Sequence, residues 1–363
     1  MSVEAVLVAS GARAPVGTTA ESVAAAVRAG ISRVRLLQVP ELGRQAESFI
    51  ARDGLLDAQE WSGAARMAAL GAAALEEVLA RLAPALPLEN VEVPVLVGLP
   101  EERPGWKAAD ASRVVAALSA LGSERLRLRV EPRLTGHASA LEGLREAVTR
   151  VGRAARSPLV IVGGVDSYHD VQTLAWLRER NQWLEEGTRT GFAPSEGSAF
   201  VAVMAAPDAR RWGLVPHATV RAAATAHETK LIHTDDLNLG EGLTAAMSEA
   251  LAPLEGTREV AASVHSDLNG ERYRSEEWGF VALRLGAAFR DASVIHTPVS
   301  SCGEVGAATG ALNLVLCAQA WRRRYASGPR ALLWGSSEAG LRAAALLEEP
   351  LSGSEEGAKP WPR

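Results

Sequence analysis

The sequence predicts a layered α/β fold, in which sheets are sandwiched between helices. Short apolar runs typical of buried strands alternate along the chain with longer segments whose apolar residues recur at helical spacing. The same alternation occurs twice, before and after a segment at residues 207–213 that we interpret as a hinge. We therefore expect two similar halves, residues 1–206 and 214–350, and a disordered tail at 351–363 that is rich in Gly, Ser, Glu and Pro.

The composition is that of a globular protein with a large core. Of the 363 residues, 47% are hydrophobic, which is enough for two domain-sized cores or one large duplicated core. The formal net charge is -5 and basic residues are scattered among acidic ones, so we expect no nucleic-acid surface. No apolar run is long enough to span a membrane, and the N-terminus lacks the pattern of a signal peptide. With Cys302 and Cys317 as the only cysteines, we expect no disulfide framework and a cytoplasmic location.

In the first half, apolar runs predict the strands and apolar stripes predict the helices. The Ala-rich segment 61–82 has Met67, Leu70 and Leu75 on one side at helical spacing. Segment 125–131 alternates basic and apolar residues with period two, which indicates a half-buried strand. The expected strands are 3–9, 91–98, 125–131, 159–162 and 200–204, and the expected helices are 22–29, 61–82, 138–153 and 173–183.

The second half repeats this order in outline. Cys317 lies among apolar residues on a long predicted helix and is therefore expected in the core. The charged segment 267–278 contains the turn-forming pair Asn269-Gly270, which predicts a loop. The expected strands are 218–224, 260–264, 293–295 and 331–334, and the expected helices are 242–251, 276–289 and 306–325.

One polar residue lies at the sharpest point of a strand, turn and helix unit. The strand 125–131 leads to Gly136, which permits a tight turn, and an apolar stripe defines the helix 138–153. The strand that follows is expected to close at Gly163-Gly164. His137 is therefore expected at the N-terminus of a helix, where nucleophiles and anion sites are often presented.

This unit resembles the active-site elbow of the β-ketoacyl-ACP synthases of the thiolase superfamily. In that family the nucleophilic cysteine lies in a sequence like T-A-C-A-S-G, followed further along by G-G-A/V-E-S. Here residues 135–140 are Thr-Gly-His-Ala-Ser-Ala and residues 163–167 are Gly-Gly-Val-Asp-Ser. Residues 191–199 resemble the family's G-F-x-P-G-E-G-A-A segment, in which Glu196 is expected to be structural. The resemblance covers residues 3–347 and implies a thiolase-like fold of two pseudo-duplicated halves in an α-β-α-β-α sandwich.

The resemblance places the family's catalytic positions at His137, His265 and Glu304, in a degenerate active site. His137 stands in place of the cysteine. His265 matches the histidine of an A-H-G-T segment, and Glu304 replaces the histidine of K-S-x-x-G-H-x-x-G-A-A-G. An acyl-imidazole hydrolyses readily and a glutamate anion cannot donate to an oxyanion, so condensation is not expected. The family's acyl-entrance loop G-F-G-G-x-N is also altered, since residues 335–340 contain neither the phenylalanine nor the asparagine.

Four further residues are candidates for substrate binding. Arg272 and Arg274 follow the site histidine and suit a carboxylate or a phosphopantetheine phosphate. Ser300 and Cys302 lie in the segment before Glu304, where Cys302 is either a displaced nucleophile or, as favoured, a small buried thiol. No metal-ligand spacing, P-loop or dinucleotide fingerprint occurs, so we expect no metal and no cofactor.

Three functions remain open. The first is a ketosynthase-like protein that does not condense but binds an acyl carrier protein, an acyl thioester such as acyl-CoA, or a partner synthase, as the cysteine-lacking chain-length factors do in heterodimers. The second is a repurposed hydrolase or acyltransferase that uses His137, His265 and Glu304. The third is a non-catalytic structural homodimer. We expect a homodimer or a heterodimer with a related synthase, since the family pairs its sheets edge to edge.

Overall fold

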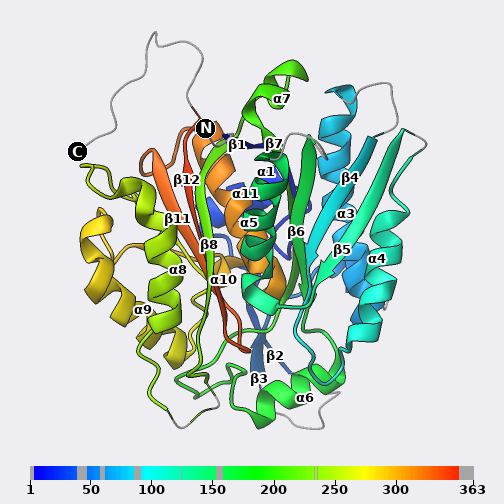
Figure 1. Ribbon diagram of the computed structural model, residues 1–363. Coiled ribbons are helices and arrows are strands. Elements are labelled where there is room, and N and C mark those ends of the chain that lie inside the picture. The colour runs from blue at the N-terminus through cyan, green and yellow to red at the C-terminus, as the bar shows by residue number, and fades with distance from the viewer. Residues whose placement is uncertain are drawn as a thin grey trace.

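The computed structural model of the protein describes residues 4–38, 47–57, 62–85, 91–123, 125–152, 158–232, 234 and 236–350. The tail predicted at 351–363 lies outside the described residues. Ten strands form one mixed sheet in the order β10-β9-β11-β12-β8-β1-β7-β6-β4-β5, and β2 and β3 form a small separate hairpin. Helices lie on both outer sides of the large sheet and between its two wings (Figure 1).

The first half contributes five strands to the large sheet. These are β1 (Ala5–Arg13), β4 (Val91–Gly98), β5 (Leu126–Arg133), β6 (Leu159–Ser167) and β7 (Glu196–Ala205), with the hairpin strands β2 (Arg35–Gln38) and β3 (Glu47–Ile50) outside it. Its helices are α1 (Ala20–Arg28), α2 (Gly54–Asp57), α3 (Gly63–Leu82), α4 (Ala111–Ser119), α5 (Ser139–Gly152), α6 (Val171–Glu179) and α7 (Ala206–Arg211).

The second half contributes the other five strands. These are β8 (Ala218–His227), β9 (Ser263–His265), β10 (Ile295–His296), β11 (Arg330–Ser336) and β12 (Leu341–Glu348). Its helices are α8 (Glu241–Leu251), α9 (Arg272–Leu285), α10 (Val299–Cys302) and α11 (Thr309–Arg322).

The two halves have the same topology. In each half the first strand pairs antiparallel with the last, the last pairs antiparallel with the strand before it, and two parallel strands continue to the edge. The halves join where β1 and β8 pair antiparallel over the three residue pairs Ala5↔Val220, Val6↔Thr219 and Leu7↔Ala218. This repeat confirms the predicted thiolase-like α/β fold with two pseudo-duplicated halves.

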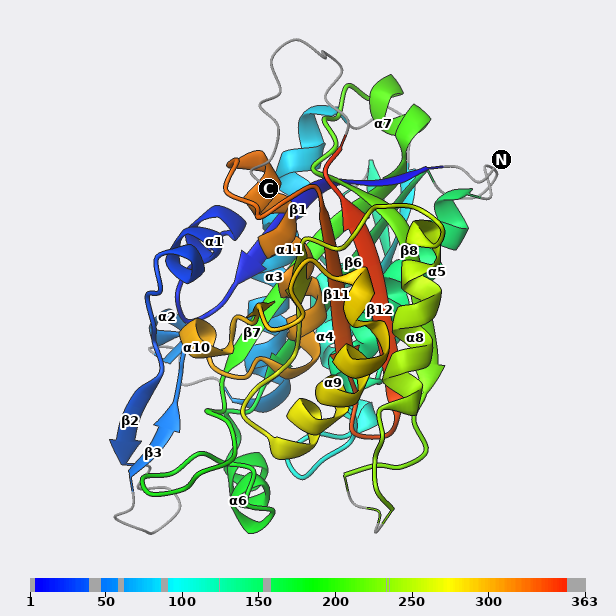
Figure 2. The ribbon, with the colours of Figure 1, turned by 90° about the vertical axis from the view of Figure 1, so that its left-hand side faces the viewer.

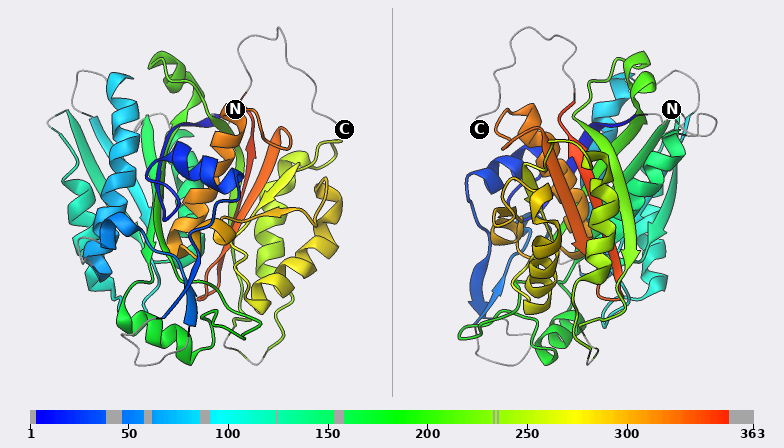
Figure 3. Two further views of the ribbon diagram at one scale, coloured as in Figure 1. Left: turned by 180° about the vertical axis from the view of Figure 1, so that it is seen from behind. Right: turned by 60° about the vertical axis from the view of Figure 1, so that its left-hand side comes forward.

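The layers follow from the alternation of side chains along the strands. In β6, Val160 and Val162 belong to a cluster that includes residues of α5 and α11, whereas Leu159 and Ile161 belong to a cluster with α3 and α4. In β11, Leu333 points to the first cluster and its neighbours Leu332 and Trp334 pack with α8 and α9. Because both strands bury both faces, each half of the sheet needs a helical layer on either side. Figure 1 and the left view of Figure 3 show the resulting order of outer helices, sheet, central helices, sheet and outer helices, and in Figure 2 the outer helices α8 and α9 lie in front of β11 and β12.

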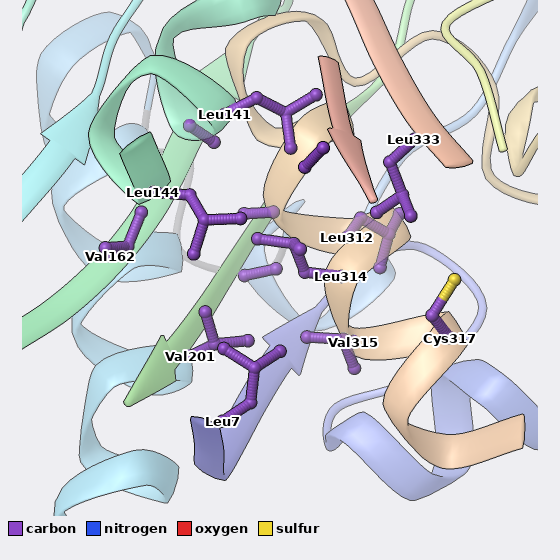
Figure 4. Packing of buried hydrophobic residues seen from close by; sticks show 14 of the residues in the cluster. Leu7, Leu141, Leu144, Val162, Val201, Leu312, Leu314, Val315, Cys317 and Leu333 are labelled. Carbon is purple, nitrogen blue, oxygen red and sulfur yellow. The ribbon is translucent and has the colours of Figure 1, made fainter. Parts of the chain in front are cut away.

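The central layer is the core that both halves share. Leu141 and Leu144 of α5 lie against Leu312 and Leu314 of α11 and the inner faces of both wings of the sheet (Figure 4). All four side chains are almost completely buried. Neither half encloses this cluster alone, because the residues on its two sides come from different halves.

Several elements differ from the sequence prediction. Gly163-Gly164 does not close β6, which continues to Ser167, because these glycines make room for the Phe200 ring and the Ala307 carbonyl group. The expected hinge at 207–213 is largely the short helix α7, which has a proline in its first turn. The hairpin β2–β3, the helices α2, α4 and α10, and strand β12 were not predicted from the sequence, and α9 begins four residues earlier than expected.

We predict that Gly163→Ala destabilises the protein. A Cβ atom at residue 163 would lie 2.0 Å from the Phe200 ring inside the sheet, so the ring or the strand must shift. Overpacking of this kind typically costs about 1–3 kcal/mol in the free energy of unfolding. The matched control is Gly279→Ala in the middle of α9, where a Cβ meets nothing within 4 Å. That change should stabilise the helix by up to about 1 kcal/mol. Chemical denaturation of both variants tests the pair, and equal stabilities would contradict this packing.

Candidate functional site

Two elbows meet at the centre of the molecule. In the first half, β5 is followed by a 3₁₀ turn at Gly136–Ala138 and then by α5. In the second half, a 3₁₀ turn at Gly306–Ala308 leads into α11. Gly136 and Gly306 both have positive φ angles, 65° and 51°, which only glycine adopts readily. Each turn therefore depends on its glycine and brings the start of a central helix to the same place.

Each elbow is held by a residue from the end of the other half's sheet. The Ala138 amide donates to Ser337 Oγ (2.9 Å), just beyond β11. The Ala307 amide donates to Asp166 Oδ2 (2.9 Å), which lies in β6. Asp166 in turn pairs with Arg103 (2.5 Å). Amide groups at helix N-termini lack partners within the helix, so these crossed contacts satisfy them and fix the two elbows together.

His137 and Glu304 are brought together by this arrangement. His137 Nε2 lies 3.3 Å from Glu304 Oε1, and the two residues are only 8% and 3% exposed. Glu304 also accepts hydrogen bonds from Asn269 Nδ2 (2.8 Å) and the Gly306 amide (2.7 Å). The carboxylate is thus fixed by these two hydrogen-bond donors and lies at ion-pair distance from an imidazole, whose charge can change near neutral pH.

A buried network of charges continues from Glu304 away from the elbow. Asn269 joins Glu304 to Glu271 (3.0 Å), and Glu271 pairs with Arg274 (3.0 Å). Arg274 also pairs with Asp267 (2.6 Å). The network contains three carboxylates and one guanidinium, so a proton on His137 brings it closer to neutrality. Buried carboxylates without compensating positive charge would be strongly unfavourable.

The pKa directions agree with this charge balance. Burial and the Arg274 charge act to lower the pKa of His137, but the contact with Glu304 outweighs them and the pKa is raised. Burial alone would raise the pKa of Glu304, but His137, Arg274 and the Gly306 amide lower it to about 2. The contact therefore favours the charged form of both groups, an imidazolium beside a carboxylate. A protonated imidazole is neither a nucleophile nor a base.

The space beside His137 is small and has a mixed lining. The cavity has a volume of about 70 Å³, and it is lined by charged residues such as Glu101 and Glu338 and by apolar ones such as Leu177 and Phe192, as well as by His137. Burial raises the pKa of Glu101, and the Ala339 amide donates to this carboxylate (3.1 Å). Such a volume holds only a few water molecules. An acyl chain of several carbons does not fit beside the imidazole as the protein stands.

His265, the third candidate catalytic residue, is not part of this cluster. It lies in β9, stacks on His296 with 4.9 Å between the ring centres, and lines a different cavity from that of His137. Burial, followed by the charge of His296, lowers the pKa of His265 to about 3, so this imidazole is neutral. Two of the three expected residues therefore meet, and Asn269 occupies the place beside Glu304 where His265 was expected.

The four candidate substrate-binding residues lie in different environments. Arg272 is exposed and pairs with Glu276 (2.6 Å) on the surface of α9. Arg274 is fully buried in the network and is not exposed to a ligand from solvent. Ser300 lines the cavity beside His265. Cys302 is fully buried in the central apolar cluster, and burial raises the pKa of its thiol to about 12.

The segment 267–278 differs most from its prediction. It was expected to be a loop, with a solvated turn at Asn269-Gly270, whereas Asp267, Asn269 and Glu271 are buried and α9 begins at Arg272. The sequence does contain acidic residues close to Arg274 on either side, and a buried guanidinium needs such partners. Nothing in a single sequence shows that such a charged segment lies inside.

Glu196 has the structural environment expected for it. Its carboxylate is completely buried and receives two hydrogen bonds from Arg66, at 2.5 and 2.6 Å. The Asp53 amide donates to it as well (2.8 Å). Within the described ranges, no group of three or more His, Cys, Asp or Glu side chains is arranged to hold a metal ion. No helix among the described residues is long and apolar enough to cross a membrane.

The fold is similar to that of several solved ketosynthases. One is a chain from a type II PKS acyl-carrier protein in complex with its ketosynthase bound to the hexaketide (13% identity, TM-score 0.77, covering 96% of this chain and 100% of that one). Another is the ketosynthase from module 6 of the bacillaene synthase of Bacillus subtilis 168, with 13% sequence identity and a TM-score of 0.77, covering 96% of this chain and 72% of that one. A third is the ishigamide ketosynthase/chain length factor, with 20% sequence identity and a TM-score of 0.69, covering 95% of this chain and 99% of that one. The chain has the ketosynthase fold.

At this level of identity, the likeness concerns the ketosynthase fold and not the chemistry. No family model matches the sequence, and no curated protein matches it either. Within the ketosynthase fold, the elbow before α5 is the place where the sequence resemblance puts the nucleophilic cysteine, and His137 occupies it here.

We predict that Glu304→Gln lowers the pKa of His137. The amide keeps the shape of the side chain but removes the charge that favours the imidazolium. NMR titration of the histidine ring should show the shift, and Glu276→Gln, which changes the exposed pair with Arg272, is the matched control.

The same variant should change how stability depends on pH. A raised histidine pKa stabilises the folded state at low pH and loses that effect as pH rises through the folded-state pKa. The stability difference between wild type and Glu304→Gln should therefore be larger at about pH 6 than at about pH 9, by about 1–2 kcal/mol. A difference that does not vary with pH would contradict the paired imidazolium.

Proposed function

We propose that this protein is a ketosynthase-like subunit that does not condense acyl groups and acts as the partner of a cysteine-containing synthase that uses an acyl carrier protein. The observation that carries the proposal is the pairing of His137 with Glu304 at the elbow (3.3 Å). This contact favours the charged form of the side chain that stands where the resemblance puts the nucleophile, and an imidazolium cannot accept an acyl group.

The absence of a usable thiol supports the same proposal. The sequence has two cysteines, and both are buried in the central apolar cluster. Burial raises the pKa of Cys302 to about 12 and also raises that of Cys317. A thioester exchange needs the thiolate form, which is scarce at neutral pH for a thiol of this kind.

The chemistry of decarboxylation is also disfavoured. A condensing site stabilises the negative charge that develops on an enolate or a thioester oxygen. Here Glu304, with its pKa lowered to about 2, presents a fixed negative charge at that place. The small volume of the cavity beside His137, about 70 Å³, adds a steric reason.

The two alternatives from the sequence receive less support. A hydrolase or acyltransferase that uses His137, His265 and Glu304 requires all three side chains in one cluster, but His265 lines a separate cavity. A purely structural homodimer has no specific feature of the described residues in its favour. Pairing with a related synthase is supported by the fold of the ishigamide ketosynthase/chain length factor, whose chain is similar to this one over 95% of this chain.

We predict that the wild-type protein forms no covalent acyl adduct. Incubation with acyl-CoA and with acyl and malonyl thioesters of an acyl carrier protein should leave its intact mass unchanged and yield no 3-ketoacyl product. A cysteine-containing ketosynthase treated in the same way is the positive control. A persistent adduct on Cys302, or extension of a primer, would refute the proposal, and Cys302→Ala would locate the adduct.

We also predict a stable complex with a partner synthase. Co-expression with each cysteine-containing ketosynthase of the same genome, followed by light scattering, should give a 1:1 complex with one of them. In the assay above, that complex should be acylated on the partner only. A protein that stays monomeric with every candidate would contradict the proposal.

A further inference from the structure

A second and larger cavity lies away from the elbows, between α1, α11 and the edge of the sheet formed by β9 and β10. Its volume is about 430 Å³, within the range typical of small-molecule sites. His265 and His296 line one side, and Trp321 and Tyr325, from the end of α11 and the residues after it, are also part of the lining. Figure 2 shows α1 beside α11 in this part of the molecule. This cavity shares no lining residue with the one beside His137.

The walls are rich in flat rings that are fixed in place. The imidazoles of His265 and His296 are stacked, with an angle of 27° between their planes. Trp321 is 5% exposed, and its Nε1 donates to the Gly328 carbonyl group (2.9 Å), which fixes the indole. Flat, immobile rings favour a flat ligand, because stacking then costs little side-chain entropy.

The charge of the lining has one sign. No Asp or Glu lines the cavity, and its one formally charged residue is Arg28. The Arg28 guanidinium lies 4.3 Å from the centre of the Tyr325 ring, and it makes no ion pair among the described residues. A guanidinium held over an aromatic ring and without a carboxylate partner is well placed to bind an anion at the cavity mouth.

Two buried polar atoms in the lining have no partner within the protein. Asn313 is 0% exposed, and its Nδ2 donates to the Ser266 carbonyl group (3.0 Å), but its Oδ1 accepts no hydrogen bond. The Nδ1 atom of His265 is also unpartnered. Neither atom is itself open to the cavity, so a ligand there would be held by the rings of the lining and by Arg28.

We propose that this cavity binds a small aromatic carboxylate, with its ring among His265, Trp321 and Tyr325 and its carboxylate on Arg28. An engineered cavity of about 150 Å³ holds benzene. The present volume is nearly three times larger and accommodates a two-ring acid. The site is independent of the proposed function, since no residue of the elbows takes part in it.

The probe for this proposal is 2-naphthoate, and its uncharged analogue 2-naphthamide is the ligand control. Isothermal titration calorimetry with the full chain should show 1:1 binding of 2-naphthoate and binding of 2-naphthamide at least about five-fold weaker, because the amide lacks the charge that Arg28 recognises. Arg28→Met should weaken the binding of 2-naphthoate by a similar factor and leave the affinity for 2-naphthamide unchanged. Ala320→Phe, which places a ring inside the cavity, should abolish binding of both.

Arg113→Met is the matched control variant, because it removes the same charge from exposed α4 on the far side of the sheet. It should bind 2-naphthoate as the wild type does. No binding of 2-naphthoate to the wild type, or equal binding to wild type and Arg28→Met, would overturn the proposal. Arg28 is exposed, so its replacement should leave the unfolding temperature unchanged, and the test stands even if Ala320→Phe fails to fold.

Discussion

The contact between the His137 imidazole and the Glu304 carboxylate links the two halves of the protein at their centre. His137 lies in the turn before α5 and Glu304 lies just before the turn that leads into α11, so the ion pair also connects the two elbows. Without the proton on His137, three buried carboxylates would face the single guanidinium of Arg274. The charge state of the site is therefore set by the fold around it.

The two elbows show how a duplicated fold divides its tasks. Residues 136–139 are Gly-His-Ala-Ser and residues 306–309 are Gly-Ala-Ala-Thr, and both segments form a 3₁₀ turn that leads into a central helix. The first elbow carries a chemical group and the second carries alanine at the matching position. The second elbow instead supplies Glu304 from the residues just before its turn. The two elbows thus have the same backbone form but contribute different residues to the site, His137 from within the first turn and Glu304 from before the second.

The fold was predictable from the sequence because buried strands and amphipathic helices leave periodic patterns. Strand β4 was predicted with its observed bounds, and α3 and α8 to within two residues. The missed elements lack such patterns. Strand β12 contains three alanines and two leucines in direct succession, at 343–347, without alternation, and α4 follows a Pro- and Gly-containing loop.

The site was predictable only in part. His137 and Glu304 were identified because a resemblance in local sequence fixes their place at the two elbows. His265 was assigned from an equally short match, but the side chain that reaches Glu304 is Asn269, four residues later. The burial of Asp267, Glu271 and Arg274 depends on partners far away in the chain, such as the Ser336 carbonyl group, which no local pattern reveals.

The shared central layer has a consequence for how the chain is made. Helix α5 emerges from the ribosome well before α11, yet the side of Leu141 and Leu144 that faces away from the first half's sheet is covered only when α11 has been synthesised. During that interval the nascent first half exposes the apolar face of α5, and His137 lacks its partner Glu304. Biosynthesis of this protein therefore requires that the early half be kept from aggregating until the late half arrives to cover it.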